Sequence, residues 1–318
     1  MRSRAIVWAV AMLAAASAWA AGSPAEQGPY EVGELRLPLV DAARGREIDV
    51  LILYPVVPGG ALPPRGFSLV VFNHGFLLRG DAYRSYGQHL ASHGFVVALP
   101  TLSMSLLGIG HTVLAQDVRH VVDRCLSLDG ERGSGLYGLI DEASIGVSGH
   151  SLGGKLALLE ATTDPRVRAV AVLDPVDVAS PGTPSTPESP SVAPELMSEI
   201  VVPLLFVGAE LGDETVLFTP CAPAGENYQA FFEAANPPAI EVTQLGVGHG
   251  QYVDPGAGLL LAACAGGPVP SDEVRAASAA YLTAFFLGHL AGDVEALLWL
   301  DARLAADTEQ GAVEVRRK

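Results

Sequence analysis

Short apolar runs alternate with helix-like segments along most of the chain. Two strand-like stretches, GELRLPLVD and EIDVLILYPV, come first. Further β-branched or apolar runs follow, with helical periodicity in much of the sequence between them. These runs read SLVVFNHG, FVVALPT, ASIGVSG, VRAVAVLDPV and VPLLFVGAE. Strands that are apolar on both faces and separated by helices predict an α/β fold, with a mostly parallel central sheet flanked by helices on both faces.

The last third of the chain completes this pattern. A strand-like AIEVTQL leads into GVGHGQYVDP, and SDEVRAASAAYLTAFFLGHLAG predicts a closing helix. The polar tail after Trp299 is expected to fray. The stretch 177–195 is rich in Pro and Ser and cannot be regular throughout. Because strand-like sequence continues after it, we interpret it as a long excursion over the carboxyl ends of the strands rather than as a linker.

The N-terminus has the form of a secretory signal. Two arginines precede an apolar stretch that ends in Ala18-Trp19-Ala20, a small-x-small cleavage pattern. A membrane anchor is the alternative, but the apolar run is short for a bilayer and is followed by Gly-Ser-Pro. We therefore predict a signal peptide over residues 1–20 and a secreted or periplasmic protein without stable membrane insertion. The remaining residues, 21–318, are predicted to form a single domain.

Composition narrows the possible partners. The chain has 318 residues, 49% hydrophobic and 17% charged, enough to bury a sizeable core, although this length would also permit two domains. Its net charge of −16 argues against nucleic acid or anionic membranes as partners. Three cysteines fit an exported protein with one disulfide and one spare thiol. Cys221 and Cys264 lie in loop-like sequence and form the better pair, whereas Cys125 falls in a helical pattern and is expected to be buried.

The segment GVSGHSLGGKLAL carries the strongest chemical signal. A predicted strand, then Gly149-His150-Ser151-Leu152-Gly153, then a helical run, is the context of a nucleophile elbow. A serine hydroxyl is a poor nucleophile at neutral pH, so it needs a base, an orienting carboxylate and donors for an oxyanion. For the donors we predict the backbone N–H groups of Leu152, after the nucleophile, and of Phe76, in the loop after VVFNHG. The His74 side chain is expected to brace that loop.

The base and the acid must follow Ser151 in the chain. Only two of the eight histidines do so, and His249 follows a strand between glycines whereas His289 lies in a predicted helix. We therefore predict His249 as the base. For the acid, Asp174 ends one apolar strand and is followed by proline, which suits a carboxylate that must hold an imidazole. Asp213, after the next strand, is the alternative; Asp177 and Glu210 lie close to the same strand ends.

Other motifs do not add a cofactor. His89 and His93 are four residues apart on a predicted helix, but no third ligand completes a zinc site, so a packed or solvated pair is the better interpretation. The glycines of GHSLGGK do not match a phosphate-binding loop, because Leu156 follows Lys155. The sequence thus predicts no metal and no nucleotide.

At this point the chain resembles the chlorophyllase branch of the α/β-hydrolases. FNHGFLLRGDAYRSYGQHLASHGFVVALP is similar to that family's block around HGF-LL and HIASHGF, and GHSLGGK to its GHSRGGK elbow. VLDPVD, PCAPAGENYQAFF and GHGQYVD are similar to its I-DPV, PPCAP-x-x-N-H-x-x-F and GH-x-D segments, in the same order, so the likeness runs from Ser68 to Asp254. The resemblance implies an α/β-hydrolase fold, with Ser151 as nucleophile, Asp174 as acid and His249 as base.

The resemblance also implies a substrate class: a carboxylic ester with a long apolar alcohol, such as the phytyl ester of chlorophyll. Leu152 and GHGQ stand where plant members commonly have arginine and GHLD, departures that leave the ester chemistry intact. The alternatives are a lipase-like, cutinase-like or short-chain esterase with the same triad, and a non-catalytic binding protein that kept the fold. The apolar segments 76–78 and 103–110 are candidate walls for a hydrophobic substrate.

Overall fold

One continuous sheet organises the molecule. The computed structural model describes residues 22–57, 59, 62–104, 110–177, 185–215, 220–256 and 264–318. Within these ranges nine strands lie in the order β1-β2-β4-β3-β5-β6-β7-β8-β9. The strands are β1 (Glu31–Asp41), β2 (Arg46–Val56), β3 (Phe67–Asn73), β4 (Phe95–Thr101), β5 (Ile140–His150), β6 (Val167–Leu173), β7 (Leu204–Ala209), β8 (Ala239–Gln244) and β9 (Val313–Arg317). Neighbours from β4 to β8 are parallel and the outer pairs are antiparallel, which confirms the predicted mostly parallel sheet.

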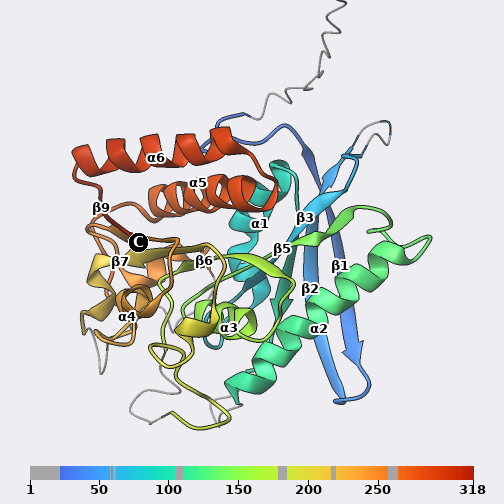
Figure 1. The fold of residues 1–318 in the computed structure, drawn as a ribbon, viewed down its shortest axis with the longest axis horizontal. Coiled ribbons are helices and arrows are strands. Elements are labelled where there is room, and N and C mark those ends of the chain that lie inside the picture. The colour runs from blue at the N-terminus through green and yellow to red at the C-terminus, as the bar shows by residue number, and fades with distance from the viewer. Residues whose placement is uncertain are drawn as a thin grey trace, which may run out of the picture.

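Helices cover both faces of this sheet (Figure 1). One face carries α1 (Arg84–Ser92), α5 (Ser271–Leu290) and α6 (Val294–Glu309). The other face carries α2 (His111–Gly130), α3 (Leu152–Ala161) and α4 (Tyr228–Ala234). The sandwich of helices, sheet and helices is the arrangement that the alternating sequence pattern predicts.

Strand β3 shows why a strand in the middle of this sheet has a continuous apolar run, here LVVF at residues 69–72. Val70 and Phe72 pack into the hydrophobic cluster that includes α1 and α5, whereas Leu69 and Val71 pack into the cluster that includes α2. None of the four is measurably exposed. Because successive side chains of a strand point to opposite faces, a strand covered on both sides needs apolar residues at every position.

The C-terminal tail contradicts the sequence-based expectation of fraying. Residues after Trp299 continue α6 to Glu309 and then form β9, which pairs antiparallel with β8 and closes that edge of the sheet. Val313 is buried in the same cluster as α5 and α6. On the opposite face Arg316 pairs with the buried Glu241 and stacks over the Phe232 ring. The prediction was wrong because the polarity of the tail does not prevent pairing: Val313 is buried, while the charged side chains stay at the surface and form ion pairs, Arg316 with Glu241 and Arg317 with Asp301.

The Pro/Ser-rich stretch returns to the core by specific contacts. Of its residues, 178–184 lie outside the described ranges. In the described part, the Glu188 carbonyl accepts the Thr112 N–H at 3.0 Å and the Ser189 hydroxyl oxygen accepts the His111 N–H at 3.2 Å. The excursion therefore reaches the start of α2, the helix that follows the carboxyl end of β4.

The cysteines follow the predicted pattern. Cys221 and Cys264 form a disulfide with a Cα–Cα distance of 5.5 Å, and Cys125 is a free, fully buried thiol in the core. The predicted signal peptide, and residues 105–109 of the second candidate wall, lie outside the described residues. Of the helices that are described, none is both long and apolar enough to cross a bilayer.

Candidate active site

Ser151 occupies a strained bend between β5 and α3. Its φ and ψ are 56° and −125°, outside the regions that a residue with a side chain normally adopts. The surrounding backbone maintains this conformation: the Ser151 N–H donates to the Leu173 carbonyl at 3.0 Å, and its own carbonyl accepts the Val176 N–H at 3.2 Å. The side chain remains partly exposed, and its hydroxyl makes no hydrogen bond to another described residue.

The two glycines of the motif allow this bend to form. A Cβ at Gly153 would lie 2.2 Å from the Asn73 carbonyl oxygen, and a Cβ at Gly149 would lie 2.4 Å from the backbone of Gly153. Any side chain at either position would therefore push β3, β5 and α3 apart. Glycine is needed here because three backbone segments approach one another closely.

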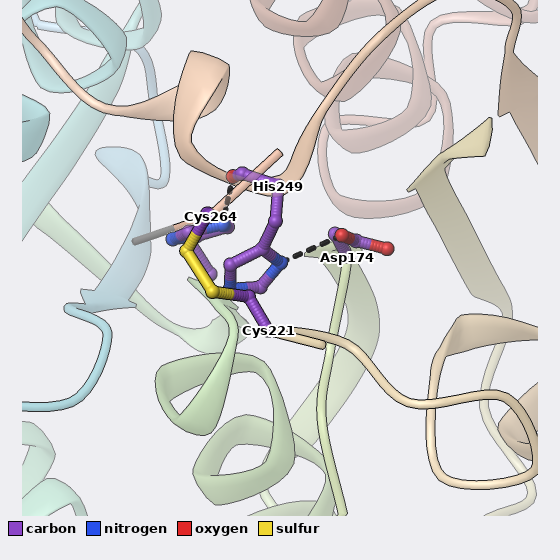
Figure 2. Close-up of a disulfide and its surroundings, with 5 residues drawn as sticks. Asp174, Cys221, His249 and Cys264 are labelled. Carbon is purple, nitrogen blue, oxygen red and sulfur yellow. Dashed lines mark hydrogen bonds and ion pairs between the residues drawn. A yellow bond between two sulfur atoms is a disulfide. The ribbon is translucent and has the colours of Figure 1, made fainter. Parts of the chain in front are cut away.

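His249 and Asp174 form a buried pair. His249 begins η5 (His249–Tyr252) after β8, and Asp174 follows the last residue of β6. Figure 2 shows the His249 ring directed at the Asp174 carboxylate. The Nδ1–Oδ2 distance is 2.7 Å, and the Asp174 Oδ1 accepts the Ala209 N–H at 3.2 Å. A carboxylate can only accept, so Nδ1 carries a proton, and in the neutral imidazole Nε2 then keeps a lone pair. That is the tautomer a general base needs.

Ser151 lies close to this pair, because the residues next to Ser151 and Asp174 in the chain contact the other members. The ring of His150, the preceding residue, lies 4.5 Å from the His249 ring, centroid to centroid. The carbonyl that accepts the Ser151 N–H belongs to Leu173, the residue before Asp174. The structure thus brings all three predicted residues to the carboxyl ends of the strands. His249 and Asp174 share a direct hydrogen bond, and Ser151 and His249 do not.

The other candidate carboxylates and the second histidine lie elsewhere. Asp213 is exposed on η4 (Glu210–Asp213), and Glu210 accepts the Gly246 N–H at 2.6 Å. Asp177 pairs with Lys155 at 3.1 Å. His289 lines a hollow of about 370 Å³ beside the first residues of β5 and β6, at the amino ends of these strands and so at the other end of the sheet from His249.

The loop after β3 passes close to the elbow at Gly75, where a Cβ would lie 3.4 Å from His150 Nδ1, and Phe76 is the next residue. Neither this N–H nor that of Leu152 donates a hydrogen bond to another described residue. His74 braces the loop, as the sequence analysis expects: its Nδ1 donates to the Gly75 carbonyl, and its Nε2 accepts the Leu102 N–H, both at 2.8 Å. Burial lowers the pKa of His74 to about 4, so the imidazole is neutral near pH 7 and can accept the Leu102 proton.

The candidate walls differ in their exposure. Phe76 is 41% exposed, an unusual degree for a large aromatic side chain. Leu78, two residues later, is 8% exposed and belongs to the hydrophobic core. Of this segment, Phe76 is the better placed to meet an apolar ligand.

The disulfide joins two loops that flank the His249–Asp174 pair. In Figure 2 the His249 ring lies between Asp174 and the Cys221–Cys264 disulfide. Beside Cys221, the Ala222 N–H donates to the Gly212 carbonyl at 2.9 Å, and a Cβ at Gly212 would meet Asp174 Oδ2 at 2.9 Å. The disulfide therefore connects segments that pack directly around the pair.

Sequence reasoning missed two buried polar groupings next to these residues. His150 hydrogen-bonds the hydroxyl of Tyr83 and the carbonyl of His249. Lys155 is fully buried and donates to both the carboxylate and the carbonyl of Asp177. A signal was present, since His150 and Lys155 stand inside the GHSLGGK motif, but their partners are 67 and 22 residues away in sequence.

Comparisons with known proteins identify the family of the chain. The chain is 26% identical to Chlorophyllase-2 of Arabidopsis thaliana over 219 residues, which are 64% of each protein. It is 27% identical to Chlorophyllase-1 of Arabidopsis thaliana over 246 residues, covering 71% of this chain and 73% of that one. It is 26% identical to the chloroplastic Chlorophyllase-1 of Citrus unshiu over 242 residues, covering 72% and 70%. The Chlorophyllase family model matches residues 23–308, so the chain belongs to the chlorophyllase family, within the α/β-hydrolase superfamily.

Proposed function

We propose that this protein is a serine carboxylic-ester hydrolase that uses Ser151, His249 and Asp174. The observation that carries the proposal is the buried 2.7 Å contact between His249 Nδ1 and Asp174 Oδ2. The residue before Asp174, Leu173, accepts the N–H of Ser151, whose backbone is strained. Family membership supports ester hydrolysis independently of this geometry. A binding protein that merely kept the fold would have no need to maintain a strained serine and a buried imidazole–carboxylate pair together.

In the proposed reaction His249 Nε2 removes the Ser151 hydroxyl proton as the oxygen attacks the ester carbonyl. The Phe76 and Leu152 N–H groups would donate to the resulting oxyanion, and Leu152 lies at the N-terminus of α3, where the helix dipole also favours negative charge. His249 then protonates the departing alcohol, and water activated by the same imidazole releases the acid. Asp174 holds the ring and stabilises its positive charge at each step.

For the substrate we propose an ester with an apolar alcohol or acyl part. The relatives are named chlorophyllases, which makes the phytyl ester of chlorophyll the first substrate to test. The exposed Phe76 beside the elbow favours a hydrophobic group near the reacting carbonyl. Leu152, which stands where plant members commonly have arginine, favours a lipase-like or short-chain esterase preference as the second candidate.

We also propose that residues 1–20 are a signal peptide and that the remaining single domain is secreted or periplasmic. Support comes from the disulfide, since such bonds persist mainly in oxidising compartments, and from the single sheet that spans β1 to β9. The chain's acidic charge favours a small-molecule substrate rather than nucleic acid.

The test compares wild type and Ser151→Ala on chlorophyll and on p-nitrophenyl esters of graded chain length. We expect wild-type turnover, loss of all turnover in Ser151→Ala, and labelling of wild type alone by a fluorophosphonate. Ser148→Ala is the matched control, because Ser148 lies three residues before Ser151, in β5, and its hydroxyl donates to the Ala171 carbonyl at 2.6 Å. An inactive, unlabelled wild type would contradict the proposal; the chain-length profile would separate the two substrate preferences.

A further inference from the structure

We propose that Tyr83 and His150 are positioning residues that hold the base His249 and the oxyanion loop in register with each other. This inference rests on the proposed function and adds a role for residues that contact neither the substrate nor the reacting atoms. It concerns one chain of hydrogen bonds from the Gly75 N–H to the His249 carbonyl, through the Tyr83 hydroxyl and the His150 imidazole.

Each link of this chain is short and buried. The Gly75 N–H lies 3.2 Å from the Tyr83 hydroxyl, which lies 2.7 Å from His150 Nδ1, and His150 Nε2 lies 3.0 Å from the His249 carbonyl oxygen. Tyr83 and His150 are fully buried. The chain thus joins Gly75 in the loop after β3, His150 at the end of β5 and the backbone of His249 at the start of η5.

The direction of every proton in this chain is determined. The His249 carbonyl can only accept, so His150 Nε2 must carry a proton. In a neutral imidazole Nδ1 is then an acceptor, and the Tyr83 hydroxyl must donate to it. That leaves the Tyr83 oxygen lone pairs for the Gly75 N–H. A chain with one self-consistent arrangement of protons fixes its members more firmly than one whose hydrogen bonds can reverse.

The chain requires His150 to be uncharged, and its surroundings ensure this. Burial lowers the pKa of His150 well below its usual value, and the neighbouring His249 lowers it further. The two rings are 4.5 Å apart. When His249 takes the serine proton and becomes positive, a neutral His150 adds no repulsion between like charges. Because the His150 ring is uncharged, it does not oppose the positive charge that His249 acquires.

The consequence is a specific division of labour. Asp174 orients the His249 ring through its side chain, whereas His150 restrains the His249 backbone through the carbonyl. Through Tyr83 the same imidazole restrains the loop that carries the Phe76 N–H. Loss of this chain would displace base and oxyanion donor relative to each other, which affects the transition state more than substrate binding.

The test is Tyr83→Phe, with Tyr86→Phe as its matched control. Tyr86 lies three residues later and is equally buried, but its hydroxyl interacts with Ser278 and takes no part in the chain from Gly75 to His249. The rate constant kcat is measured with p-nitrophenyl acetate and expressed per active site, counted by fluorophosphonate labelling. We expect kcat of Tyr83→Phe to fall roughly 10- to 100-fold with KM nearly unchanged, and Tyr86→Phe to match wild type.

A spectroscopic readout tests the chain without turnover. The ¹⁵N resonances of His150 in Ser151→Ala should show a protonated Nε2 and an unprotonated, hydrogen-bonded Nδ1, with only the Nδ1 resonance moving strongly on Tyr83→Phe. Equal kcat per labelled site in Tyr83→Phe and Tyr86→Phe would overturn the inference, as would a protonated Nδ1. Absence of wild-type turnover and labelling would instead contradict the proposed function, so the two failures are distinguishable.

Discussion

Asp174 and Asp177 are buried carboxylates three residues apart, yet their surroundings differ in kind. Asp177 is surrounded by fixed donors: the Lys155 ammonium, the Ser191 hydroxyl at 2.8 Å, and the Val192 and Ala193 N–H groups at 2.9 to 3.0 Å. Asp174 has one backbone donor at 3.2 Å and a histidine. The donors around Asp177 occupy its oxygens and exchange no proton with it, whereas Asp174 is paired with a histidine, which can take up and release a proton.

This difference separates a structural carboxylate from a proposed catalytic one. Asp177 ties the end of β6 and α3 to residues 191–193, where the Pro/Ser-rich stretch returns to the core. Replacing Asp177 should therefore lower the free energy of unfolding. Asp174 makes few bonds beyond its histidine, so replacing it should lower the rate of the reaction instead. Burial alone does not distinguish the two roles, since both are less than 7% exposed.

The largest expected effect is that of Asp174→Asn on turnover. Asparagine keeps the shape but presents an amide that cannot stabilise a positive His249, and it favours the wrong tautomer. We expect kcat to fall by about 10⁴-fold with little change in the midpoint of thermal unfolding. Steady-state kinetics and thermal denaturation of the same preparation provide the measurement. Turnover within tenfold of wild type would exclude Asp174 as the acid.

Asp177→Asn should give the reverse result. It leaves the buried Lys155 ammonium without its counter-ion, and we expect the free energy of unfolding to drop by about 3 to 5 kcal/mol. Activity per folded molecule, counted by active-site labelling, should change far less than in Asp174→Asn. Urea denaturation measures the stability loss. Lys155→Met combined with Asp177→Asn is the control, because removing both charges should restore part of the stability.

A third buried carboxylate adds a dependence on pH. Glu160, 1% exposed on α3, has its pKa raised to about 8 because burial outweighs its ion pair with Arg119. Since the folded state then holds this proton up to about pH 8 and the unfolded chain loses it near its ordinary value of 4.5, stability should fall as pH rises from about 5 to 8. The slope from this group is at most about 1.4 kcal/mol per pH unit.

Glu160→Gln removes this titration. Urea denaturation of wild type and variant at several values of pH between 5 and 8 should therefore give stability curves that diverge as the pH rises, with the variant gaining on the wild type. Parallel curves would show that Glu160 does not keep its proton in the folded protein.

The smallest effect is expected for Asp213→Asn. Asp213 is exposed on η4, and its carboxylate makes no ion pair with another described residue. Turnover and unfolding midpoint should both stay within error of wild type, for example in the p-nitrophenyl acetate assay. A large loss of turnover would instead move the role of the acid from Asp174 to Asp213.

The interior of the fold was predictable because the residue pattern of a strand by itself indicates whether that strand is buried. The runs that form β3, β4, β6 and β7 are apolar at nearly every position, and this local property predicts a covered parallel sheet without knowledge of partners. The segment that forms β9, VEVRR, has alternating polarity, and the partner of its Arg316 is Glu241, 75 residues away in the sequence. Such a strand cannot be recognised until its partner is placed.

The candidate site divides in the same way. A strand–glycine–serine–helix pattern predicts the elbow at Ser151, because its geometry depends on consecutive residues. The choice between Asp174 and Asp213 was open, since both follow adjacent strands and only the fold brings one of them to His249. The Tyr83–His150 contact joins residues from different elements, and nothing in either local sequence specifies it.

The position of β9 has a consequence for handling the protein. Its pairing with β8 ends at Lys318, whose N–H donates to the Ala239 carbonyl at 2.9 Å. Proteolytic trimming of the last residues would therefore leave β8 as an open strand edge with unsatisfied backbone groups, a template on which chains can associate. Preparations that lose a few C-terminal residues should be the ones that aggregate on storage.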